Sequence, residues 1–217
     1  MKTNIVFLGP PGCGKGTQAA LLKERLSLCH ISTGELLRQE IHHETSLGLM
    51  IKEEMNQGRY VPESIVLEIL VTYLSRHAHE KGFIFDGFPR TLSQAEWFET
   101  FLASQGEVLK GVIYFAIHEE ILIKRLSGRF TCAVCGATYN EYFKKPHHEG
   151  TCDVCGSHEF SRRADDAEGR VAERLRVYHE QTRPLLPFYQ KKGLLREIDV
   201  TRSVDKVSSE ILAAVIS

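Results

Sequence analysis

Residues 4–17 read Asn-Ile-Val-Phe-Leu-Gly-Pro-Pro-Gly-Cys-Gly-Lys-Gly-Thr. The apolar run at 5–8 is typical of a buried strand, and a turn with three glycines separates it from Lys15. Residues 18–26 then predict an amphipathic helix, with Ala19, Leu22 and Leu26 on one side. A strand, a glycine-rich turn and a helix N-terminus form a cradle whose backbone N–H groups bind phosphate. The stretch therefore predicts a nucleotide site in which Lys15 reaches the β- and γ-phosphates.

The residue after Lys15 departs from the general phosphate-loop pattern. The spacing is Gly-x4-Gly-Lys, but Gly16 follows where serine or threonine is usual, and Thr17 comes one place later. This puts in doubt a direct bond between a hydroxyl group and Mg²⁺. The alternative interpretation is a glycine-rich turn at a helix N-terminus, which the preceding strand and the Lys-Gly-Thr sequence disfavour.

Composition limits the class of protein. The chain has 217 residues, a net charge of −1, 42% hydrophobic residues and 25% charged residues, as expected for one α/β domain with small insertions. This charge gives no general attraction to nucleic acid or membranes, so an anion site needs a local arginine cluster. No apolar run has the length of a membrane span, and the first residues lead directly into the predicted strand, so we expect no signal peptide. We therefore expect a cytoplasmic protein that acts without nucleic acid or a membrane.

The alternation of strands and helices predicts a mostly parallel sheet with helices on both faces. Beyond the first strand and helix, the predicted strands are 29–32, 82–86, 112–117 and 194–199. The predicted helices begin near residue 35 and after Thr91, and cover 46–56, 63–76, 119–126, 167–181 and 204–216. Pro184 and Pro187 should interrupt or kink the helix after residue 181.

Polar residues follow the predicted strands. Asp86 ends the strand at 82–86 and a sharp turn leads to Arg90, so both should lie at the ligand-binding edge of the sheet. Ser32 or Thr33 could simply cap a helix, with Glu35 completing a capping box. Arg125 and Arg129 share a helix face if the helix at 119–126 continues.

Residues 129–166 have a different composition, rich in Cys, Gly, His and Lys. The pairs Cys132-x2-Cys135 and Cys152-x2-Cys155 have the spacing of two knuckles that complete a tetrahedral zinc site. Unpaired buried thiols are the disfavoured alternative. The nearby histidines, which are His147, His148 and His158, are interpreted as solvated loop residues, because four thiolates already fill the shell.

Several separated motifs together resemble the adenylate kinase family, in the type with a zinc-bearing lid. The matching segments are Gly-Pro-Pro-Gly-Cys-Gly-Lys-Gly-Thr at 9–17, Ile-Ser-Thr-Gly-Glu-Leu-Leu-Arg at 31–38, Asp-Gly-Phe-Pro-Arg-Thr at 86–91 with Gln94, Arg-Leu-Ser-Gly-Arg at 125–129, and Arg-Ala-Asp-Asp at 163–166 with Arg174. The family's phosphate loop also has glycine after the lysine, so Gly16 is normal within it.

The resemblance implies a P-loop NTPase-type fold and Mg²⁺-dependent phosphoryl transfer from ATP to AMP, giving two ADP. The implied catalytic residues are Lys15, Arg90, Arg129, Arg163 and Arg174. The implied ATP contacts are Gly12, Cys13, Gly14, Lys15, Gly16, Thr17, Arg125, Arg129 and Val200. The implied AMP contacts are Thr33, Gly34, Arg38, Arg59, Val61, Gly87, Arg90, Gln94, Arg163 and Arg174. Asp86 would hold Mg²⁺ through water, and Val200 stands where the family would place a glycine beside the ATP base.

The resemblance also divides the chain. It implies a core formed by 1–32, 77–128 and 167–217, a monophosphate-binding insert at 33–76 and a zinc-binding lid at 129–166, in a monomer. The lysine and arginines named above agree with this chemistry, because phosphoryl transfer depends on positioning and charge neutralisation. The sequence shows no evident Ser-His-Asp or Cys-His set for a covalent mechanism.

The sequence is also compatible with two alternatives. A kinase of the same architecture could use another monophosphate, or GTP as donor, because base selection depends on few contacts. A nucleotide switch could instead bind nucleic acid through the cysteine-bearing segment. That segment has Lys144 and Lys145 but also four acidic residues, Glu141, Glu149, Asp153 and Glu159, so it offers no uniformly basic face.

Overall fold

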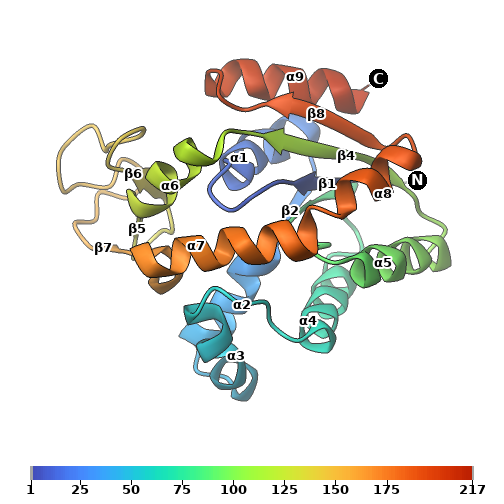
Figure 1. Ribbon diagram of the computed structural model, residues 1–217, viewed down its shortest axis with the longest axis horizontal. Helices are drawn as coiled ribbons and strands as arrows, with labels where there is room; N and C mark the ends of the chain where they lie inside the picture. Colours follow the sequence, from blue (N-terminus) through green and yellow to red (C-terminus); the bar gives the residue numbers. More distant parts are fainter. Residues whose placement is uncertain (1, 217) are drawn as a thin grey trace.

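The computed structural model describes residues 2–216, and its centre is a five-stranded parallel sheet with the order β2-β3-β1-β4-β8 (Figure 1). The strands are β1 (Thr3–Leu8), β2 (Cys29–Ser32), β3 (Gly82–Asp86), β4 (Leu109–Ala116) and β8 (Leu195–Asp199). The apolar run at 5–8 lies in the central strand and is almost fully buried, because neighbours cover it on both sides.

Helices cover both faces of this sheet, as the sequence predicts. The helices are α1 (Lys15–Leu26), α2 (Thr33–His42), α3 (Ser46–Asn56), α4 (Glu63–Arg76), α5 (Leu92–Ser104), α6 (Glu119–Ser127), α7 (Glu168–Val177), α8 (Leu185–Lys191) and α9 (Val204–Ile216). Successive residues of β1 point to opposite faces. Ile5 and Phe7 therefore pack with α1, α6, α7 and α9, while Val6 and Leu8 pack with α2, α4, α5 and α8.

The segment between β2 and β3 consists of α2, α3 and α4, which lie together on one side of the molecule (Figure 1). The turn into α3 is tight: Thr45 Oγ1 accepts a hydrogen bond from the N–H of Gly48 at 3.0 Å. A Cβ atom on Gly48 would lie 2.1 Å from the Glu40 carbonyl oxygen, so only glycine allows α2 and α3 to approach this closely.

A second, smaller sheet projects beyond the ends of α6 and α7 (Figure 1). It is antiparallel, with the order β6-β5-β7, and its strands are β5 (Arg129–Cys132), β6 (Thr138–Asn140) and β7 (Phe160–Ser161). Because α6 ends at Ser127 and Arg129 begins β5, the helix does not continue and Arg125 and Arg129 share no helix face. The ring of Tyr142 packs directly on Gly128 at this junction.

The predicted long helix at 167–181 is shorter in the structure. A 3₁₀ turn, η1 (Ala164–Asp166), precedes α7, and a π-helical turn, η2 (Tyr178–Thr182), follows it. Pro184 cannot donate a backbone hydrogen bond and its ring would collide with the carbonyl four residues earlier, so the wider turn accommodates it. Pro187 lies in the first turn of α8, where its missing N–H costs little. Among residues 2–216, no helix combines the length and hydropathy needed to traverse a bilayer.

Candidate active site

The glycine-rich loop at 9–14 connects β1 to α1. Gly9, Gly12 and Gly14 all have positive φ angles, of 154°, 81° and 106°. At Gly12 a Cβ atom would also lie 2.8 Å from Leu126, so a larger residue would be both strained and blocked. The Nζ of Lys15 donates hydrogen bonds to the carbonyls of Gly9 at 2.8 Å and Pro10 at 3.0 Å. The ammonium group therefore lies over the loop at the N-terminus of α1.

Asp86 lies beside this loop, at the end of β3. β1 and β3 are parallel neighbours in which Phe7 pairs with Asp86, so both strands end at the same edge of the sheet. A Cβ atom on Gly16 would lie 3.6 Å from Oδ2 of Asp86. Burial would raise the pKa of Asp86, but His30, whose Nε2 is 3.6 Å from Oδ2, and the charge of Lys15 together lower it. The group is therefore ionised at neutral pH. His30 was not singled out from the sequence, because a lone histidine in a strand carries no spacing signal.

The turn after β3 holds Arg90. Nε of Arg90 donates to the carbonyl of Gly87 at 2.8 Å, and Thr33 Oγ1 donates to the same carbonyl at 2.7 Å. The backbone N–H of Arg90 donates to Oε1 of the buried Gln94 at 2.8 Å. The side chain of Ser32, not that of Thr33, caps α2 by accepting from the N–H of Glu35 at 3.4 Å. Thr33 is thus available to tie α2 to the turn after β3.

The residues that precede α4 divide into different environments. Arg59 pairs with Glu54 and is exposed, whereas Val61 is buried in the core cluster that also contains residues of β3. Between them, the ring of Tyr60 lies under the guanidinium of Arg90, 4.9 Å from its centroid to Cζ. Tyr60 was missed at the sequence level, since nothing in its neighbourhood indicates an aromatic platform for a residue thirty positions away.

A network of arginines and carboxylates joins α2, β5 and α7. Arg129 forms a bidentate ion pair with Asp166, with both distances 2.6 Å, and Arg174 pairs with Asp166 and, at 3.0 Å, with Asp165. Burial and the positive charges of Arg129 and Arg38 lower the pKa of Arg163 to about 10, which still leaves it charged at neutral pH.

Glu35 connects this network to α2. Its carboxylate accepts hydrogen bonds from Arg38, at 2.6 Å, and from Arg163. Burial would raise the pKa of Glu35, but these arginines lower it, Arg38 most strongly. The sequence interpretation gave Glu35 a capping role only. The structure instead brings it to the guanidinium groups, and the predicted arginines Arg38, Arg129, Arg163 and Arg174 lie around one set of three carboxylates.

Arg125 contacts three separate segments of the chain: the glycine-rich loop, the residues after β8 and the residues after β6. It donates to the carbonyl of Cys13 at 3.0 Å and to that of Val200 at 3.3 Å, and its Cζ lies 5.6 Å from the ring centroid of Phe143. Val200 itself is buried, in the same core cluster as Cys13 of the loop, and it contributes its backbone carbonyl to this contact. Asn140, another residue missed from the sequence, donates to the Arg125 carbonyl at 2.8 Å.

The four cysteines of residues 129–166 converge. Their Sγ atoms lie within 4.8 Å of one another, with 3.6 Å between Cys132 and Cys155 and 3.5 Å between Cys135 and Cys152. Tetrahedral zinc with Zn–S bonds of about 2.3 Å requires sulfur atoms about 3.8 Å apart, so the donor set fits that ion. No described histidine belongs to the cluster.

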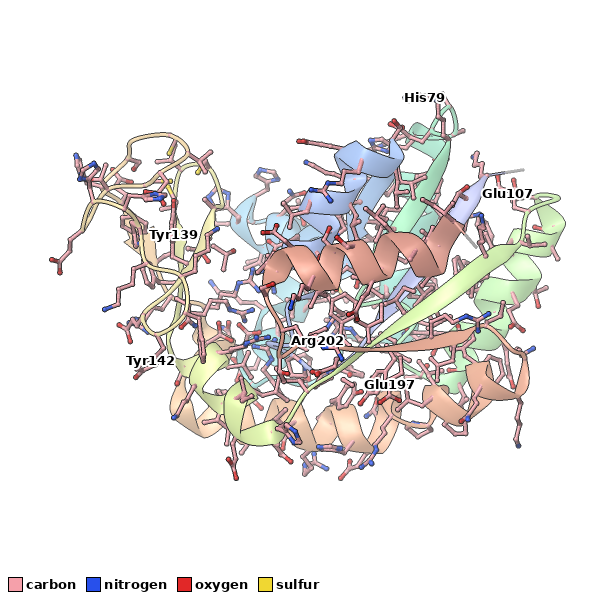
Figure 2. All side chains as sticks on the ribbon, turned by 90° about the horizontal axis from the view of Figure 1, so that it is seen from above. His79, Glu107, Tyr139, Tyr142, Glu197 and Arg202 are labelled. Carbon is pink, nitrogen blue, oxygen red and sulfur yellow. The ribbon has the colours of Figure 1, made fainter. Side chains whose placement is uncertain are left out.

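Tyr139 supports this cluster from inside the small sheet (Figure 2). Its hydroxyl accepts a hydrogen bond from the N–H of Asp153 at 2.7 Å and donates to Sγ of Cys152 at 3.4 Å. That hydrogen bond, together with the backbone N–H groups of Val154 and Cys155, lowers the pKa of Cys152 to about 6, which favours the thiolate that a metal would bind.

The parallel sheet, the glycine-rich loop with Lys15 and the carboxylate at the end of the adjacent strand define a protein of the P-loop nucleotide-binding class. A profile of the family described as adenylate kinase matches residues 7–194. The adenylate kinase of Novosphingobium aromaticivorans is 44% identical over 97% of both chains. Those of Enterococcus faecalis and a Geobacillus species are 43% and 46% identical, each over 96% of both chains. The chain therefore belongs to the adenylate kinase family, whose members are nucleoside monophosphate kinases.

Proposed function

We propose that the protein catalyses reversible, Mg²⁺-dependent phosphoryl transfer from ATP to AMP, giving two ADP. The observation that carries this proposal is the pairing of Phe7 with Asp86 in adjacent parallel strands. It brings the loop of Lys15 and the turn of Arg90 to one edge of the sheet. A donor phosphate on the first and an acceptor phosphate on the second would then face each other, which is the positioning that phosphoryl transfer needs.

On the donor side, the backbone N–H groups of the loop and Lys15 would hold the ATP phosphates. This follows from the positive dipole at the N-terminus of α1 and the lysine directly above the loop. The proposed ATP contacts are Gly12, Cys13, Gly14, Lys15, Gly16, Thr17, Arg125, Arg129 and Val200. Because Val200 contacts Arg125 through its backbone carbonyl, valine in place of glycine should have a modest effect.

On the acceptor side, Arg90 would bind the monophosphate of AMP, with Gln94 reading the base. The fixed orientation of the Arg90 guanidinium, between Gly87 and the Tyr60 ring, supports a bidentate contact. The proposed AMP contacts are Thr33, Gly34, Arg38, Arg59, Val61, Gly87, Arg90, Gln94, Arg163 and Arg174. The side chain of Arg59 pairs with Glu54, so its proposed contact would come from the backbone.

Four arginines would neutralise the charge on the transferring phosphoryl group: Arg90, Arg129, Arg163 and Arg174. Asp165 and Asp166 hold Arg174 in place, and Asp166 also holds Arg129. Arginines fixed in this way need little reorganisation when charge develops in the transition state. All these residues come from one chain, so we propose that a monomer suffices.

Both metals fit residues of the chain. Asp86, ionised and adjacent to the loop, would hold Mg²⁺ through water, and that ion would neutralise phosphate charge. Cys132, Cys135, Cys152 and Cys155 would hold a structural zinc ion, since four thiolates leave no open position for substrate. The proposed domains follow: a core of 1–32, 77–128 and 167–217, a monophosphate-binding insert at 33–76 and a lid at 129–166.

The proposal is tested by a panel of nucleoside monophosphates, each incubated with ATP and Mg²⁺ and scored by the diphosphate formed. AMP should be the best acceptor. Faster turnover of another monophosphate would assign the same architecture to that substrate, whereas no diphosphate from any member would reject the proposed reaction.

Replacing Arg90 with alanine is expected to reduce kcat/KM for AMP by more than about tenfold, or about 1.4 kcal/mol of transition-state stabilisation. The bidentate contact with the monophosphate would be lost, while the ATP loop would remain intact. Steady-state kinetics with each substrate varied in turn would measure the loss. The matched control is Arg76→Ala, at the exposed end of α4. If the affinity for ATP fell and the use of AMP did not, the two subsites would be wrongly assigned.

A further inference from the structure

Thr182 lies at the end of η2, the π-helical turn between α7 and α8. The N–H of Arg183 donates to the carbonyl of Tyr178 at 2.9 Å, which closes a turn of five residues instead of four. The extra residue rotates Thr182 relative to a continuous α-helix, and such turns are frequent at functional sites. Thr182 is buried, with 4% of its surface exposed.

The hydroxyl of Thr182 has two partners, and their chemistry fixes the direction of both hydrogen bonds. Oγ1 donates to the carbonyl of Arg90 at 2.8 Å, since a carbonyl can only accept. The single hydroxyl proton is thereby used, so the hydroxyl of Tyr60, at 2.7 Å, must donate to Oγ1. Two successive hydrogen bonds therefore link the Tyr60 hydroxyl, as donor, through Thr182 to the backbone carbonyl of Arg90.

Thr182 is the fourth group that contacts Arg90. Gln94 accepts from the Arg90 N–H, Gly87 accepts from its Nε, and the Tyr60 ring lies under its guanidinium. Thr182 is the group that holds the Arg90 carbonyl, and through Tyr60 it also holds the ring on which the guanidinium rests. The three residues come from separate parts of the chain, at 60, 90 and 182.

We propose that Thr182 is a positioning residue for the monophosphate subsite, acting through Arg90 and Tyr60. The inference rests on the proposed function, because it assigns Arg90 to the phosphate of AMP. Without the hydroxyl, the Tyr60 hydroxyl and the Arg90 carbonyl lose their shared partner in a poorly solvated position. The guanidinium would then occupy a broader range of orientations, and binding of AMP, but not of ATP, would weaken.

The test compares Thr182→Val, which removes the hydroxyl at nearly constant volume, with Thr182→Ser, which keeps it. We expect Thr182→Val to raise KM for AMP about tenfold, the effect of leaving a buried polar group without its hydrogen-bond partner, with KM for ATP changed less than about twofold. Thr182→Ser should stay within about twofold of the wild type for both substrates. Tyr60→Phe keeps the ring and removes the donor, so combined with Thr182→Val it should add no further loss.

The other possible outcomes of this experiment would contradict the positioning role of Thr182. Equal changes in both KM values, failure of serine to restore AMP binding, or additive losses in the double variant would each show a merely structural role and overturn the inference. If Thr182→Val does not fold, Thr182→Ala at low temperature replaces it against the same serine control. A wild type that forms no ADP from ATP and AMP would contradict both the inference and the proposed function. An active wild type with an unaffected Thr182→Val would contradict the inference alone.

Discussion

Replacing Lys15 with methionine should lower turnover by about 100-fold or more while the protein remains folded. Removing one fixed donor to a developing charge typically costs about 10²–10³ in rate, and Lys15 supplies the ammonium group above the phosphate loop. Methionine retains the length of the side chain but has no charge and no hydrogen to donate. The measurement is ADP formation at saturating ATP and AMP, together with thermal unfolding of both proteins.

The matched control is Lys23→Met, an exposed lysine two turns further along the same helix, α1. It should leave turnover within about twofold, because a surface lysine outside the site contributes little. Near-normal turnover in a well-folded Lys15→Met protein would contradict the assignment of the phosphate loop.

If the four cysteines bind zinc as proposed, then removing the metal, or replacing Cys152 with serine, should melt the proposed lid at 129–166 before the rest of the protein. A segment of this size has too little core to fold without a metal ion or another cross-link, so metal binding would contribute its folding free energy. The lid should then unfold in a separate, earlier transition, and any part of the loss that reaches the core would lower the Tm of the core by about 2–4 °C per kcal/mol in a chain of this length. Calorimetry, elemental analysis and hydrogen exchange of the lid would follow the change. Below the new transition, the phosphate loop should still bind nucleotide.

Cys29→Ser is the control for this experiment, since Cys29 lies in β2, outside the cluster, and its loss should leave the metal content unchanged. A metal-free protein whose lid stays protected from exchange but whose turnover vanishes at low temperature would assign the ion a direct chemical role. That result would exclude the structural interpretation.

Local patterns were sufficient for most of the fold. Successive side chains of β1 enter different core clusters, Ile5 and Phe7 on one face of the sheet and Val6 and Leu8 on the other. This follows from the two-residue period of a strand. The predictions were incomplete where one residue changes the geometry. The predicted helix at 119–126 is confirmed as α6, but it stops before Gly128 and does not extend to Arg129. The predicted helix at 167–181 is α-helical only to Val177 and ends in a π-helical turn before Pro184.

The sequence alone determined the class of site, because a phosphate loop and paired Cys-x2-Cys knuckles depend on residues that are close in the chain. Only the tertiary structure decided which distant side chains meet. Glu35 pairs with Arg163 across 128 positions, and Thr182 bonds to Arg90 across 92. Such contacts depend on how strands and helices pack in space. No periodicity or spacing in the sequence predicts which distant residue a single charged or hydroxyl side chain will contact. Glu35, Tyr60 and Thr182 are therefore recognised as functional candidates only in the folded chain.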